Sequence, residues 1–126
     1  MTVFLFLPRF VDPIRAGTKL QTIRRTARVV SGQVMALRMW TGKPYRSPQE
    51  NIVPPVVCAN VHTIWIAVDW FDNRIDVAID GEPVEDVPAF VRADGFRCVS
   101  DMVGYYRDHK VDAFHGSLIR WKEVLP

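Results

Sequence analysis

Cysteine is scarce in this sequence and long apolar runs are absent, and both features narrow the class of protein. Only two of the 126 residues are cysteine, Cys58 and Cys98, and neither belongs to a CxxC pair. Small secreted domains usually carry several disulfides, so we expect a reducing, cytoplasmic location. We interpret both thiols as ordinary buried side chains, with a catalytic nucleophile as the alternative. Because no stretch of 18 apolar residues occurs, we predict no membrane span.

Histidine is also rare, and its distribution argues against a metal site. His62, His109 and His115 have no ligand spacing with each other or with cysteine, whereas zinc sites use closely spaced ligands of these types. We therefore expect neither a metal nor another cofactor. Residues 1–8 are apolar but lack a basic leader and a small-residue cleavage site, so we interpret them as part of a first strand and not as a signal peptide.

The residues that are present suit one folded domain. Hydrophobic residues make up 48% of the chain and are spread along its whole length, which is enough to bury a core. No linker or internal repeat interrupts them. We therefore predict a single domain over residues 1–126.

Charge is distributed unevenly along the chain. Residues 1–50 hold nine basic and two acidic side chains, a net charge of +7, and the remainder holds seven basic and twelve acidic ones, a net charge of −5. A basic end of this kind could attract phosphate or nucleic acid. Alternatively, the two halves interdigitate in the fold and leave a mixed surface.

Alternating apolar and polar residues between turn signals predict mostly strands. The predicted strands cover residues 3–7, 34–40, 56–68, 75–79 and 118–124. Three short helices are predicted behind the N-cap residues Asp12, Asp86 and Ser100. They cover about residues 13–16, 87–93 and 101–109, and the last has Met102, Tyr105 and Tyr106 on one face, which we predict to be core. Since few parallel βαβ units occur, we predict an α+β fold with a curled, mostly antiparallel sheet or small barrel.

Four reactive or charged side chains crowd into seven residues just after a helix stop at Gly17: Lys19, Thr22, Arg24 and Arg25. A lysine with a lowered pKa can take the proton of a hydroxyl group, and the alkoxide can then attack a carbonyl carbon. Burial or a neighbouring cation lowers such a pKa. Lys19 and Thr22 meet only if the backbone turns between them. Otherwise they are a solvated loop residue and an edge-strand residue.

Three segments, in the same order along the chain, resemble the ASCH domain family. Residues 10–24 contain the core G-x-K-x-x-T-I-R, residues 93–102 resemble the acidic-Gly-Phe segment that leads into the next family helix, and residues 114–121 resemble the closing strand. The resemblance implies a PUA-like, mostly antiparallel β-barrel with short flanking helices. It also implies nucleosides or single-stranded RNA as ligands.

The resemblance also implies roles for three residues. Some small bacterial ASCH proteins remove the acetyl group from N4-acetylcytidine with a lysine and a threonine of this motif and a downstream glutamate. By motif position, it implies Lys19 as base, Thr22 as nucleophile and Asp94 as the acid partner. Asp94 is one methylene shorter than the family glutamate, and the alternative is a residue that only ends a helix before Gly95. Three nearby acids are further candidates for this role: Glu82, Glu85 and Asp86.

Ligand binding has its own candidates. We predict that Arg24, Arg25 and Arg9 contact substrate or nucleic acid. Trp40 directly precedes the polar loop 41–50 and Tyr45 lies within it, where they could stack a base, with partly buried packing as the alternative.

Three functions remain open from the sequence. The first is hydrolysis of an N-acyl group on a cytidine-type base. The second is a non-catalytic module that binds single-stranded RNA or a modified base. The third is a ribonuclease, which would need Lys19 as acid or base because no histidine pair is arranged for that reaction.

Overall fold

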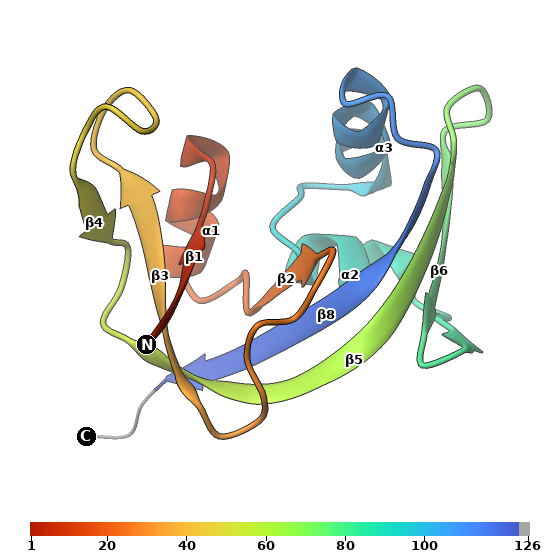
Figure 1. The fold of residues 1–126 in the computed structure, drawn as a ribbon. Coiled ribbons are helices and arrows are strands. Elements are labelled where there is room, and N and C mark those ends of the chain that lie inside the picture. Colours follow the sequence, from red (N-terminus) through yellow and green to blue (C-terminus); the bar gives the residue numbers. More distant parts are fainter. Residues whose placement is uncertain (124–126) are drawn as a thin grey trace.

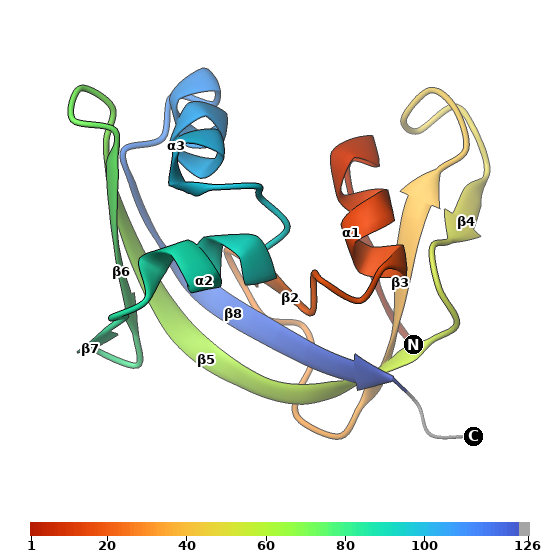
Figure 2. The same cartoon turned by 180° about the vertical axis from the view of Figure 1, so that it is seen from behind.

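A long, strongly bent pair of strands organises the molecule (Figure 1). The computed structural model describes residues 1–123. Strand β5 (Val56–Asp69) pairs antiparallel with β8 (Ala113–Glu123) over most of its length, with a register shift between Cys58 and Asn60. Together they form a curved base, and the other elements rise from its two ends (Figures 1 and 2).

One group of elements stands at the end where β5 begins. It consists of β1 (Thr2–Leu5), the 3-10 helix η1 (Pro8–Phe10), α1 (Val11–Arg15), β3 (Val34–Trp40) and β4 (Gln49–Asn51). The other group consists of β6 (Arg74–Ile79), β7 (Glu82–Pro83), α2 (Val87–Ala93) and α3 (Val99–Asp108). Strand β2 (Gln21–Arg24) lies between the groups, paired antiparallel with β8.

The prediction of an α+β fold with a mostly antiparallel sheet is confirmed. Of the seven strand pairings in residues 1–123, only β1 with β3 is parallel. Backbone pairing within these residues does not close the sheet into a barrel. Instead, side chains reach the edge strand β1: Arg24 donates a hydrogen bond to the Leu5 carbonyl and Arg28 donates one to the Val3 carbonyl.

Two predicted helix starts are wrong for local reasons. Asp12 does not cap a helix. The 3-10 turn at Pro8–Phe10 runs directly into α1, so Asp12 already lies inside that helix. Helix α3 begins before Ser100, with Cys98 at its N-cap. There the Asp101 carboxylate accepts the Arg97 N–H at 3.0 Å, which ties down the first turn from inside the helix.

Other local predictions hold. Asp86 caps α2 by accepting the Ala89 N–H at 3.0 Å, and strand β3 has the predicted limits. The closing strand begins earlier than predicted, at Ala113, because β8 follows β5 along its bend. The predicted end of that strand, Val124, lies outside the described residues.

Of the two cysteines that were predicted to be buried, only one belongs to the core. Cys58 is buried as predicted, but Cys98 is exposed, because it lies at the open end of α3. Met102 and Tyr106 are buried as predicted. None of the helices formed by residues 1–123 has the length and apolar character needed to cross a membrane.

Candidate functional site

A pocket of about 340 Å³ is lined by residues of the β1–η1 segment, of β2 and of the α2–α3 group. Its polar and charged lining residues are Lys19, Thr22, Arg24, Arg25, Asp94 and His109. Its aromatic lining residues are Phe6, Phe10, Phe96, Tyr105, Tyr106 and Phe114. The pocket therefore combines a small cluster of ionisable groups with an aromatic wall.

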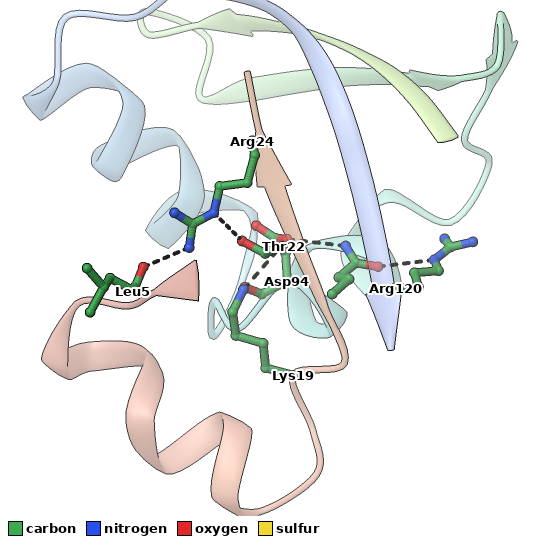
Figure 3. A network of polar contacts seen from close by, with 7 residues as sticks. Leu5, Lys19, Thr22, Arg24, Asp94 and Arg120 are labelled. Carbon is green, nitrogen blue, oxygen red and sulfur yellow. Dashed lines mark hydrogen bonds and ion pairs between the residues drawn. The ribbon is translucent and has the colours of Figure 1, made fainter. Parts of the chain in front are cut away.

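Lys19 is buried in this pocket by the turn that ends α1. Gly17 adopts a φ of 77°, in the left-handed region that favours glycine, and the N–H groups of Thr18 and Lys19 both donate to the Pro13 carbonyl, at 3.1 and 3.0 Å. The Lys19 side chain is only 3% exposed. Its Nζ donates to the Asp94 carbonyl at 2.5 Å and lies 3.8 Å from Asp94 Oδ1 (Figure 3).

Burial dominates the electrostatics of Lys19. Removal from water lowers the pKa of its ammonium group, and the nearby Arg24 guanidinium lowers it further, while the negative charge of Asp94 opposes both effects. The ammonium also lies 4.7 Å from the centre of the Phe10 ring, a favourable cation–π contact. The net direction is a lowered pKa, so at a given pH a larger fraction of Lys19 is the neutral amine than for an exposed lysine.

Asp94 lies at the end of α2, and Gly95 allows Lys19 to approach it. Gly95 has a φ of 100°, and a Cβ built on it would lie 2.8 Å from Lys19 Cδ and 2.9 Å from Phe10 Cδ1. Any side chain there would displace the lysine. Gly95 thus has a second role beyond the predicted helix stop, which is to make room for the Lys19–Asp94 contact.

Asp94 is buried as well, which raises the pKa of its carboxyl group. The positive charge of Lys19, a hydrogen bond from Gln21 and the charge of Arg24 all act in the opposite direction. Gln21 Nε2 donates to Asp94 Oδ1 at 3.3 Å. Because burial disfavours both the ammonium and the carboxylate, the neutral forms of Lys19 and Asp94 lie closer in free energy to their charged forms than they do for two exposed groups of these types.

Thr22 is held by a cation. It is buried in β2, and its Oγ1 accepts a hydrogen bond from Arg24 Nε at 3.1 Å. Arg24 is itself fixed by a 2.7 Å hydrogen bond to the Leu5 carbonyl (Figure 3). The centre of the Phe6 ring lies 5.0 Å from its guanidinium carbon. Burial lowers the pKa of Arg24, but a guanidinium stays protonated in proteins. The Thr22 oxygen therefore lies beside a fixed positive charge.

The other predicted arginines have different positions. Arg25 is exposed and lines the pocket. Arg9 forms an ion pair with Asp101 at 2.6 Å, and its guanidinium carbon lies 4.8 Å from the centre of the Phe96 ring. Arg9 thus connects η1 to α3 and supports the aromatic wall, whereas we predicted that it contacts the ligand.

Trp40 and Tyr45 are not brought to this pocket. Trp40 lines a second hollow of about 350 Å³ between η1–α1 and the end of β3, which shares only Phe6 and Leu7 with the first. The rings of Trp40 and Tyr45 have centroids 5.1 Å apart. Their contact with each other fits the packing alternative.

The alternative acids and the histidines are also placed. The carboxylates that compete with Asp94 are exposed and outside the lining of the pocket: Glu82, Glu85 and Asp86. His109 lines the pocket, while His62 Nδ1 lies 2.6 Å from Asp80 Oδ2 on the distant β5–β6 hairpin. In the part of the chain that the structure describes, no group of three or more His, Cys, Asp or Glu side chains could hold a metal.

Sequence reasoning missed three residues of the site. Tyr105 and Tyr106 line the pocket although their helical spacing predicted core packing only. Gln21 contacts Asp94, and no signal in the sequence predicted this, because a glutamine beside a predicted loop is usually solvated. Comparison of the chain with family models, with curated proteins and with solved structures gives no match.

Proposed function

We propose that this chain is an ASCH-type domain that hydrolyses an N-acyl group on a cytidine-type base. One observation carries the proposal. Lys19, Thr22 and Asp94 are the three positions that the family motif implies, and all three line one pocket although Asp94 lies 75 residues beyond Lys19. The absence of competing acids from that lining supports Asp94 as the acid partner.

The proposed reaction gives each of these three side chains a separate role. The neutral Lys19 amine takes the Thr22 hydroxyl proton as the Thr22 oxygen attacks the acyl carbonyl carbon, and Arg24 stabilises the negative charge that forms. The tetrahedral intermediate collapses, the bond to the base nitrogen breaks, and Lys19 returns the proton to the leaving amine. Water then hydrolyses the Thr22 ester and releases the acid. Asp94 orients Lys19 and supports its charge when it carries the proton.

The lining of the pocket supports a planar heterocycle as ligand. Aromatic rings form one wall, with Tyr105 at its centre, 5.3 Å from the ring of Phe96 and 4.2 Å from that of His109. Such rings offer stacking surfaces to a nucleobase. A volume of about 340 Å³ is near the lower end of small-molecule sites, which favours one nucleoside over a polymer.

The strand arrangement is compatible with a PUA-like barrel. The sheet is strongly bent (Figure 1). Arg24, in β2, and Arg28, in the segment after it, donate hydrogen bonds to carbonyl groups of the edge strand β1. We propose that these two arginines close the barrel where backbone hydrogen bonds do not.

The test is incubation of the purified chain with N4-acetylcytidine while the release of cytidine is followed by chromatography. We expect turnover by the wild-type chain and a loss of about 100-fold or more for Lys19→Ala. Equal inactivity of the two proteins on a series of acylated cytidines would overturn the hydrolase proposal. Inactivity together with salt-dependent binding of single-stranded RNA would instead support the binding module.

A further inference from the structure

The side-chain amide of Gln21 is buried, and both its nitrogen and its oxygen form hydrogen bonds. Gln21 is the first residue of β2, it pairs in register with Arg120 of β8, and it is 3% exposed. Its Nε2 donates to Asp94 Oδ1 at 3.3 Å, and its Oε1 accepts from Arg120 Nε at 3.5 Å (Figure 3). A guanidinium can only donate, so Arg120 fixes the amide oxygen on its own side and leaves the NH₂ group facing Asp94.

The carboxyl group of Asp94 is therefore held from two sides. Lys19 approaches Oδ1 at 3.8 Å and Gln21 approaches the same oxygen at 3.3 Å. We propose that Gln21 is a positioning residue, which holds the Asp94 carboxyl group toward Lys19 while Arg120 fixes the orientation of the Gln21 amide. This inference rests on the proposed function, because the Lys19–Asp94 pair is the proton-handling part of that reaction.

The charges around Asp94 give the direction of the effect. Lys19 and Arg24 favour the carboxylate, as does the hydrogen bond from Gln21, while burial disfavours it. Tyr105 and Tyr106 lie close enough for Asp94 to raise the pKa of both phenols, though less than burial does. Removal of the Gln21 donor leaves the cations in place and takes one hydrogen bond from the charged form, so the pKa of Asp94 must rise.

The experiment compares the wild-type chain with Gln21→Met, which keeps the length and removes both hydrogen bonds, and with Arg120→Met, which leaves β2 intact. The titration of the Asp94 carboxyl carbon is followed by NMR, and kcat and KM for N4-acetylcytidine are measured against pH. Gln49→Leu, in the exposed strand β4, is the control. We expect Gln21→Met to raise the pKa of Asp94 by about one unit and to lower kcat about tenfold with little change in KM. Arg120→Met changes both in the same direction by less.

The outcomes separate this inference from the proposed function. If the wild type turns over substrate and neither variant moves the Asp94 titration or the pH profile, the positioning role is overturned and the hydrolase proposal stands. If the wild type is inactive but the Asp94 titration still moves in Gln21→Met, the contact is real and the proposed reaction is overturned. If Gln21→Met does not fold, Arg120→Met decides by the same two measurements.

Discussion

Two hollows of nearly equal volume meet at Phe6 and Leu7, just before η1, and they differ in the residues that line them. The first, about 340 Å³, contains the buried Lys19, Thr22 and Asp94. The second, about 350 Å³, is mostly apolar and has Asp12 as its only ionisable lining residue among residues 1–123. The exposed Tyr45, beside it, packs on Trp40.

Volume alone therefore does not distinguish a candidate reactive site from a mostly apolar hollow. Desolvation lowers the pKa of Lys19 and raises that of Asp94, and a buried charged pair survives only where each partner compensates the other. The fold maintains this costly arrangement with a left-handed turn at Gly17 and a close approach at Gly95. Nothing comparable supports the second hollow in the described residues, so we place the chemistry in the first.

The largest expected effect is on catalysis. Lys19→Met keeps the length of the side chain and removes the amine, so we expect N4-acetylcytidine turnover to fall by about 100-fold or more. The matched control is Lys43→Met, in the exposed loop beside the second hollow, which should retain wild-type turnover within about twofold. Equal losses in both variants would show that net charge, and not the buried amine, governs the rate.

The next prediction concerns stability. It compares a glycine that contacts Lys19 with a glycine that lines the second hollow. Gly95→Ala places a methyl group 2.8 Å from Lys19 Cδ at a φ of 100°, so we expect the free energy of unfolding to drop by about 2–3 kcal/mol. Gly42→Ala, at the second hollow, meets only Ser47, with Cβ at 3.5 Å and Oγ at 3.8 Å, and should cost less than about 0.5 kcal/mol. Urea unfolding followed by fluorescence measures both. A loss below about 1 kcal/mol for Gly95→Ala would contradict the close packing of Lys19.

Features of the site that depend on near neighbours could be predicted from the sequence, whereas its long-range contacts could not be predicted by local rules. Gly17 and Asp86 could be interpreted locally, because a left-handed helix end and an N-cap are set by near neighbours. The contact of Lys19 with Asp94 was available only through the family resemblance, since no local rule joins residues 75 positions apart. The position of Trp40 could not be predicted, because the course of β3 and of the loop after it depends on long-range pairing with β1 and β4.

A smaller effect should appear in the pH dependence of stability. The pKa of Lys19 in the folded chain is lowered from 10.5, so between that lowered pKa and 10.5 the unfolded chain binds more protons, and stability rises with pH across this window. Lys19→Met lacks this contribution. It also removes the cation that opposes the rise in the pKa of Asp94 caused by burial. The pKa of Asp94 in the folded variant is therefore higher still, and the folded variant keeps a proton that the unfolded variant releases. The variant thus loses stability as pH rises.

The titration of Lys19 in the wild type and that of Asp94 in the variant both increase the stability of the wild type relative to the variant as pH rises. The free energy of unfolding of the wild type, minus that of Lys19→Met, should therefore increase as pH rises toward 10.5. Urea titrations at a series of pH values measure this difference, in which the other titrating groups largely cancel. A constant or falling difference would mean that Lys19 stays protonated in the folded chain up to its ordinary pKa.

The smallest expected effect is at the second hollow, and it decides whether the two hollows act separately. Trp40→Ala removes the ring that contacts Tyr45, 5.1 Å away between centroids, but leaves every contact of Lys19 unchanged. We expect kcat/KM for N4-acetylcytidine to change less than about twofold. The same measurement on an acetylated oligonucleotide tests whether a longer ligand extends from the first hollow past Leu7, which lines both, into the second. A loss on the oligonucleotide alone would make the second hollow a subsite for a neighbouring base, whereas a comparable loss on the nucleoside would show that the two hollows form one site.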